Sequence, residues 1–286
     1  MEYRALTFVP DQPGGFEMKI IKPKGILVPI GGGSEDDLII QRIINESGRR
    51  HPKICYITLA VSDEGEAKHN QRSFAHKFGA KNVSFIHYKL HSEANSEANI
   101  KKVHDCDIVL IGGGNQLGLS SLLGGTLLMS EIKKRYYDEK KFIVCGSSAG
   151  AAAMSNTMIL SGSSQDALIK GELQLTNGLD LINNVFIDTH FTDRGRFGRV
   201  IQTVAYNPGV LGLGLSENTG AIIRGGDRLE IVGKGLAVIV DGTEIEYSNV
   251  IDLQDGDPIT LTGLKMHIFG PGKSFSIDAR QIILSD

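Results

Sequence analysis

The sequence has no long apolar run, few cysteines and no strong excess of charge of one sign. No stretch of its 286 residues reaches the roughly 20 consecutive apolar positions that a membrane helix needs. Residues 1–10 include Glu2 and Arg4 and lack the apolar segment of a secretory signal. The net charge is −3, from 30 basic and 33 acidic residues, so we expect neither a nucleic acid nor a membrane as a partner.

The cysteines indicate a reducing compartment. Cys55, Cys106 and Cys145 are an odd number at wide spacings, and each lies in or beside an apolar run. No pair has the spacing of a zinc finger, so we expect three buried free thiols. The sequence therefore predicts a cytoplasmic protein.

Short apolar runs alternate with helix-like segments over the first three quarters of the chain. The runs lack an alternation of polar and apolar residues, as is typical of strands that helices cover on both faces. This pattern predicts an α/β protein with a doubly wound, mostly parallel sheet. The expected strands are 25–30, 54–59, 83–88, 107–111 and 142–145, and the expected helices are 36–46, 66–78, 96–104 and 127–139.

The last quarter of the chain has a different pattern. From residue 221 short strands are separated by the hairpin signals Gly225-Gly226-Asp227 and Asp241-Gly242. We expect an antiparallel β-rich extension, residues 221–286, packed on an α/β core of residues 1–220. Because no linker or repeat separates the two parts, residues 1–286 are expected to form a single domain.

A nucleophile turn is predicted at Gly146-Ser147-Ser148-Ala149-Gly150. An apolar strand precedes it and small, helix-forming residues follow, which is the strand-turn-helix setting of a nucleophile elbow. The flanking glycines leave room for a serine at the apex, and the N–H of Ala149 is placed to bind an oxyanion. The structural alternative is a small-residue turn that lets the strand and helix pack closely. We favour Ser148 as the nucleophile of a serine hydrolase.

A serine nucleophile needs a general base and an orienting acid. Of the eight histidines, His190 alone ends an apolar strand, 185–188. Glu217 follows the next apolar strand, 211–215, and is the favoured acid. Asp188 and Asp193 flank His190 and compete for that role, and Asp188 is also a candidate to line the pocket.

Two further segments are expected near the serine. Gly112-Gly113-Gly114-Asn115-Gln116 follows a strand but lacks a Walker lysine and a dinucleotide fingerprint, so a nucleotide loop is disfavoured. We expect Gly114 to give a second oxyanion N–H and Gln116 to reach the substrate. A second set, Arg194, Arg196 and Arg199, either binds a substrate carboxylate or forms a solvated basic face.

Taken together, these motifs resemble those of the cyanophycinases, serine exopeptidases related to the aspartyl dipeptidases (peptidase E). The matching segments are Gly112–Gln116, Gly146–Ala151, Asp188-Thr189-His190-Phe191 with the three arginines, and Gly212–Glu217. Their order and spacing agree across most of the chain.

The resemblance implies a fold like that of class I glutamine amidotransferases, a homodimer, and the triad Ser148, His190 and Glu217. The implied substrate is cyanophycin, a polyaspartate with arginine on each side-chain carboxyl, and the implied product is the β-aspartyl-arginine dipeptide. No metal or organic cofactor is implied. The positions that the family uses to hold substrate match Gln116, Asp188, Thr189, Arg194, Arg196 and Arg199.

Some positions depart from the family pattern. Thr189 stands where glutamine is frequent, and Asn115 stands where aspartate is common. The aspartyl dipeptidases share the asparagine, but they are shorter, lack this arginine set and typically have aspartate in place of Glu217. An α-aspartyl dipeptidase or another small-peptide hydrolase is therefore the alternative. A catalytically inactive binding protein and a nucleotide-binding protein are weaker ones.

Overall fold

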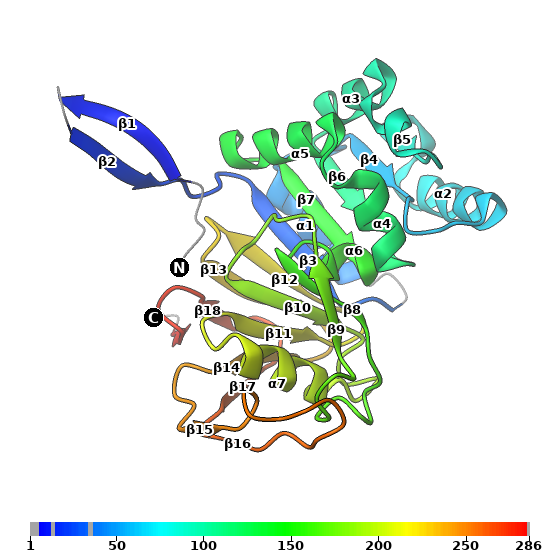
Figure 1. Cartoon of the computed structure of the whole chain (residues 1–286). Coiled ribbons are helices and arrows are strands. Elements are labelled where there is room, and N and C mark those ends of the chain that lie inside the picture. Colours follow the sequence, from blue (N-terminus) through cyan, green and yellow to red (C-terminus); the bar gives the residue numbers. More distant parts are fainter. Residues whose placement is uncertain (1–5, 13–14, 34–36, 285–286) are drawn as a thin grey trace.

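The computed structural model describes residues 6–12, 15–33 and 37–284. Its largest element is a nine-stranded sheet with the order β19-β18-β13-β12-β3-β7-β6-β4-β5 (Figure 1). The five strands from β3 to β5 in this order are parallel, and they confirm the predicted α/β class. These strands are β3 (Ile26–Ile30), β4 (Ile54–Ile57), β5 (Val83–Ile86), β6 (Ile108–Ile111) and β7 (Ile143–Ser147).

Helices cover both faces of the parallel strands. Helices α1 (Asp37–Ser47) and α2 (Glu64–Phe78) pack on one face, and α3 (Glu97–His104), α4 (Gln116–Leu123) and α5 (Leu127–Asp138) pack on the other. Alternate residues of one strand enter different cores: Leu27 joins the α5 side, whereas Ile26 and Val28 join the α1 side. The strands read as continuously apolar because both of their faces are buried. Residue 36, the expected start of the first helix, lies outside the described residues.

A second sheet of four strands has the order β10-β11-β14-β17. Its strands are β10 (Val185–Thr189), β11 (Leu211–Leu215), β14 (Ala237–Asp241) and β17 (Lys265–Phe269). One face, which includes Ile187 and Leu213, shares the large core of the main sheet. The other face, which includes Phe186 and Val238, packs against α7 (Phe197–Tyr206).

The strands after residue 220 are divided between the two sheets. The main sheet takes up β12 (Thr219–Arg224), β13 (Arg228–Gly233), β18 (Ser274–Ser276) and β19 (Gln281–Ile283). The second sheet joins β14 and β17 to the earlier β10 and β11. The expected division at residue 220 therefore does not separate one sheet from the other.

Several smaller elements complete the described chain. The helix α4 was not predicted, because Gly118 and a following glycine pair weaken its helical pattern. The short strand pairs are β1 (Leu6–Gln12) with β2 (Gly15–Ile20), β8 (Thr157–Ser161) with β9 (Gln174–Asn177), and β15 (Tyr247–Ser248) with β16 (Leu261–Thr262).

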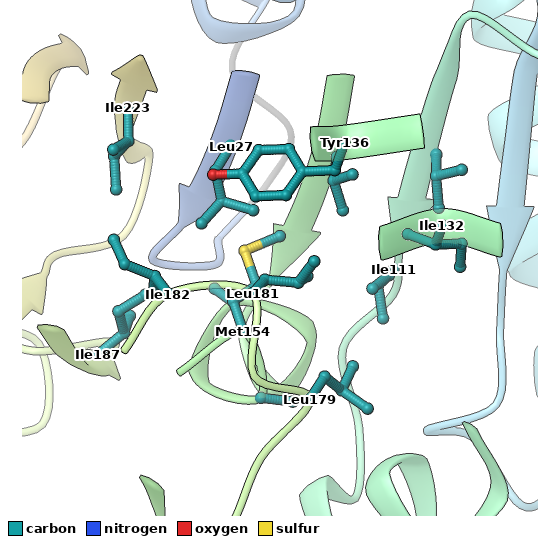
Figure 2. Close-up of a cluster of buried hydrophobic side chains, with 14 of the residues drawn as sticks. Leu27, Ile111, Ile132, Tyr136, Met154, Leu179, Leu181, Ile182, Ile187 and Ile223 are labelled. Carbon is teal, nitrogen blue, oxygen red and sulfur yellow. The ribbon is translucent and has the colours of Figure 1, made fainter. Parts of the chain in front are cut away.

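The large core lies between the main sheet, the helices α3 to α5, the short helix α6 (Ala149–Ala152) and the second sheet. Figure 2 shows side chains from distant parts of the chain meeting in it, including Leu27 of β3, Tyr136 of α5 and Ile223 of β12. No helix in the described ranges combines the length and the apolar composition needed to cross a membrane.

Truncation of this core should lower stability. Ile223 is fully buried, so Ile223→Ala is expected to reduce the free energy of unfolding by about 2–5 kcal/mol. The matched control Ile251→Ala removes the same atoms from a side chain that is 85 % exposed. It should change the free energy of unfolding by less than about 0.5 kcal/mol. Urea unfolding of both variants measures the difference, and equal losses would contradict the described core.

Candidate active site

Ser148 forms the apex of a strained turn. It lies between β7 and the short helix α6 (Ala149–Ala152), with φ 52° and ψ −114°. A Cβ on Gly146 would lie 2.4 Å from the Gly150 carbonyl oxygen, and one on Gly150 would lie 2.2 Å from the Ile111 carbonyl oxygen. Both flanking glycines are therefore needed for the chain to pass this closely on each side of the serine.

The side chains of Ser148, His190 and Glu217 form one hydrogen-bonded chain. Ser148 Oγ lies 2.8 Å from His190 Nε2, and His190 Nδ1 lies 2.7 Å from Glu217 Oε1. A carboxylate at Nδ1 holds the proton on that nitrogen, which leaves Nε2 as the acceptor for the serine hydroxyl. This geometry allows His190 to act as a general base toward Ser148.

The loop after β3 fixes the backbone of all three segments. Ser148, His190 and Asn218, the residue after Glu217, have φ values of 52°, 48° and 53°, which cost a non-glycine residue about 1–3 kcal/mol each. Each donates its backbone N–H to one of three successive carbonyl oxygens. The pairs are Ser148 with Ile30 (3.0 Å), His190 with Gly31 (2.8 Å) and Asn218 with Gly32 (2.8 Å).

Gly32 also passes directly against the histidine ring. A Cβ at this position would lie 2.4 Å from Cε1 and 2.6 Å from Nε2 of His190. The glycine therefore gives the imidazole the space that it needs beside Ser148.

Asp193, a candidate for orienting His190, has a different contact. Its Oδ2 accepts the backbone N–H of Glu217 at 2.9 Å. The carboxylate thus holds the segment that carries Glu217, while Glu217 itself contacts the imidazole.

Asp188 lies at the centre of a buried ionic cluster. Arg199 Nη2 donates to Asp188 Oδ1 at 3.1 Å, whereas Arg199 Nε is 3.0 Å from Oδ2 in poor hydrogen-bond geometry. Arg196 Nη1 lies 3.3 Å from Asp188 Oδ1 and donates to the Thr189 carbonyl oxygen at 2.8 Å. Burial raises the pKa of the Asp188 carboxyl above its ordinary value, and the two guanidinium groups oppose that rise.

The glycine loop after β6 lies beside the serine. A Cβ on Gly113 would lie 3.1 Å from Ser148 Cβ and 3.7 Å from its Oγ, so the next peptide, with the N–H of Gly114, is close to Ser148. Among the hydrogen bonds of the described residues, none uses the N–H of Gly114 or Ala149. Both groups are therefore available to an oxyanion.

A family model, described as Peptidase family S51, matches residues 27–232 of the chain. The chain belongs to peptidase family S51. It is therefore a serine-type peptidase, and the matched region contains all three members of the hydrogen-bonded chain.

The curated relatives of this S51 peptidase include several cyanophycinases. One from Trichormus variabilis is 30% identical over 276 residues, which cover 95% of this chain and 92% of the relative. One from Synechococcus elongatus is 28% identical over 263 residues, which cover 91% of this chain and 81% of that relative. Among solved structures, a peptidase from an acI-B1 Actinobacterium matches with a TM-score of 0.66 at 20% identity, over 90% of this chain and 98% of its own, which supports the shared fold.

The remaining expected site residues of the S51 peptidase lie in distinct surroundings. Gln116 is the first residue of α4, half-buried, while the Asn115 side chain caps that helix by accepting the Gly118 N–H at 2.7 Å. Thr189 is buried beside Asp188, and Arg194 is exposed. No ion pair among the described residues includes Arg194, so its charge is available, whereas Arg199 is buried against Asp188. The described residues also hold no cluster of His, Cys, Asp and Glu suited to a metal ion.

Sequence reasoning missed two parts of the site. It did not predict that the carbonyl groups of the loop after β3 would hold the segments of Ser148, His190 and Glu217. It also did not predict the second sheet, in which His190 follows β10 and Glu217 follows β11. The run Gly31-Gly32-Gly33 was the signal in the sequence that could have identified the loop after β3.

The buried cluster generates a pH-dependent prediction. Arg199→Gln removes one counter-charge, so the pKa of Asp188 should rise further. Because the folded-state pKa then lies above the unfolded value of about 3.9, the free energy of unfolding falls as the pH rises from the unfolded-state pKa to the folded-state pKa. We expect a loss of about 3–5 kcal/mol at pH 8 and a smaller one at pH 5.

Urea unfolding at both pH values measures this difference. Arg194→Gln is the matched control, since it removes the same group from an exposed position, and it should leave stability unchanged at both. An Arg199→Gln loss that is equal at pH 5 and pH 8 would contradict the titration of Asp188.

Proposed function

We propose that the chain is a serine exopeptidase that hydrolyses cyanophycin to β-aspartyl-arginine dipeptides, with Ser148, His190 and Glu217 as its catalytic triad. The observation that carries the proposal is the hydrogen-bonded chain from Ser148 Oγ through both nitrogens of His190 to Glu217, at 2.8 and 2.7 Å. The cyanophycinases among the relatives support the substrate, because the similarity covers more than nine-tenths of this chain.

In the proposed mechanism, Ser148 Oγ attacks the scissile carbonyl carbon while His190 Nε2 takes the hydroxyl proton. Glu217 stabilises the imidazolium that forms, and the N–H groups of Ala149 and Gly114 bind the oxyanion. Collapse of the tetrahedral intermediate breaks the C–N bond, and His190 gives its proton to the leaving amine. A water molecule, activated by the same histidine, then releases the acyl group from Ser148.

The arginines near the site suit a substrate that carries a carboxylate. Arg194 is exposed and Arg196 is half-buried, so both can approach a substrate carboxylate. Guanidinium groups bind carboxylates through two parallel hydrogen bonds. Arg199 acts indirectly in this proposal, by holding Asp188 beside Thr189. Gln116, the first residue of the helix that follows the glycine loop, provides an amide for the substrate in this proposal.

We further propose a cytoplasmic homodimer. Cys55, Cys106 and Cys145 are buried and free, as a reducing compartment permits, and burial raises the pKa of the Cys145 thiol. Light scattering coupled to size-exclusion chromatography reports the oligomeric state.

Incubation with insoluble cyanophycin tests reaction and substrate together. The wild type is expected to release β-aspartyl-arginine, measured by mass spectrometry, and Ser148→Ala should lower turnover by about 10⁴-fold or more with its unfolding midpoint unchanged. Ser147→Ala is the matched control, since it removes a neighbouring hydroxyl outside the triad, and it should retain activity. Activity retained in Ser148→Ala would refute the triad.

The products also separate the two substrate classes. If the wild type releases nothing from cyanophycin but cleaves aspartyl dipeptides, the alternative of an α-aspartyl dipeptidase replaces the proposed substrate and leaves the triad in place.

The space that Gly32 leaves for His190 can be tested separately. Gly32→Ala should slow turnover by about 10²-fold, because the new Cβ displaces the imidazole from Ser148. Gly256→Ala is the matched control: its φ of 96° is close to the 101° of Gly32, but its Cβ would meet nothing within 4 Å. Steady-state kinetics on both variants distinguish backbone strain, which they share, from displacement of the ring. Equal activities would contradict the contact.

A further inference from the structure

A cavity of about 380 Å³ lies on the α1 and α2 side of the main sheet. Its walls come from α1, α2 and the central strands, and include Ile44, Phe74, Phe78, Tyr56, Leu110 and Cys145. All of its lining residues belong to the described part of the chain. Ser148 and His190 do not line it, whereas Gly114, a proposed oxyanion donor, does, so the cavity adjoins the site of the proposed reaction without containing the serine or the histidine.

The cavity interrupts a face that parallel sheets ordinarily bury completely. Tyr56 and Leu110 lie on β4 and β6, inner strands of the sheet, yet both are only half-buried. Helices normally seal such strands from water. Close packing leaves few gaps larger than a water molecule, and an apolar cavity of about 150 Å³ is already large enough to bind benzene. The void between α1 and α2 is therefore large enough for a small organic molecule.

The composition of the walls defines the class of ligand. Aliphatic and aromatic side chains line most of the cavity, and no Lys, Arg or His is among its lining residues. Glu66 and Asn70 of α2 give polar groups at the rim, where Glu66 is exposed and Asn70 half-buried. Such walls suit an uncharged, largely apolar molecule with one hydrogen-bond donor for Glu66 or Asn70.

Two glycines separate the cavity from the proposed catalytic residues. Gly32 and Gly113 both line it. On their other side, a Cβ on Gly32 would lie within 2.6 Å of His190 Nε2, and one on Gly113 would lie 3.1 Å from Ser148 Cβ. A molecule that presses on these two glycines acts on the positions of the imidazole and the serine.

We propose that this cavity is a second ligand site, which takes an uncharged apolar molecule with one hydrogen-bond donor and alters the Ser148–His190 geometry through Gly32 and Gly113. The occupant is a small molecule rather than part of the substrate, because the glycine loops lie between the cavity and Ser148 Oγ.

Binding can be measured with N-phenyl-1-naphthylamine, an uncharged fluorescent probe with a single N–H donor. We expect saturable binding at one site per chain, weakened at least about tenfold by Ile44→Trp, which fills the cavity from α1. Gln41→Trp is the matched control, because it places the same side chain on the exposed face of α1 and should bind the probe as the wild type does.

The smaller change Ile44→Phe provides a second blocking variant if Ile44→Trp unfolds. Absence of saturable binding by the wild type, or equal binding by wild type, blocking variant and control, would overturn the site. This experiment does not depend on the proposed function.

Coupling to the serine is tested by the rate at which a fluorophosphonate labels Ser148. This part depends on the proposed function, so labelling of the wild type without the naphthylamine, and its loss in Ser148→Ala, are established first. Saturating naphthylamine should then slow labelling by about fivefold or more in the wild type and in Gln41→Trp, but not in Ile44→Trp. An unchanged rate in the wild type at saturation would overturn the coupling.

Discussion

Three successive carbonyl groups at the end of β3 hold the site together. Ile30, Gly31 and Gly32 each accept the N–H of a residue with positive φ, and those residues carry or adjoin the three members of the proposed triad. At each position a backbone hydrogen bond offsets the conformational strain. The side-chain contacts of 2.8 and 2.7 Å therefore do not have to hold the strained backbone in place. Because β3 lies between β7 and β12, the loop is anchored on both sides.

The same loop joins two sheets that contribute different chemistry. The main sheet supplies Ser148 at the end of β7, with a helix N-terminus and the glycine loop beside it. The second sheet supplies His190 and Glu217, which follow the parallel pair β10 and β11. The shared core, to which Ile187 and Leu213 contribute from the second sheet, fixes one sheet against the other. Precision at the proposed triad therefore depends on packing between the sheets as well as on the turns themselves.

The sequence was sufficient for the elements whose signal is local. The continuous apolar strands, the helices α1, α2, α3 and α5, and the glycine-flanked serine turn each depend on a few neighbouring residues, and each was predicted. The helix α4 was missed because Gly118 interrupts its pattern, although Asn115 was an available N-cap signal. The second sheet was missed because strand order depends on contacts across the chain: Leu211-Gly212-Leu213-Gly214-Leu215 reads as a buried strand in either sheet. The ion pairs of Asp188 with Arg196 and Arg199 were likewise not visible, since spacing shows that charges are near one another but not which of them pair.

The division of the proposed triad between the two sheets also bears on how the protein is made. A growing chain that has reached residue 200 contains Ser148 and His190, but β11, Glu217 and Asn218 have not been synthesised. Before that point the Gly32 carbonyl oxygen lacks its hydrogen bond from the Asn218 N–H, and the His190 imidazole lacks the Glu217 carboxylate at Nδ1. With the proposed triad, hydrolytic competence arises only when the segment that carries Glu217 docks, so the topology itself keeps a chain that has not reached this segment inactive.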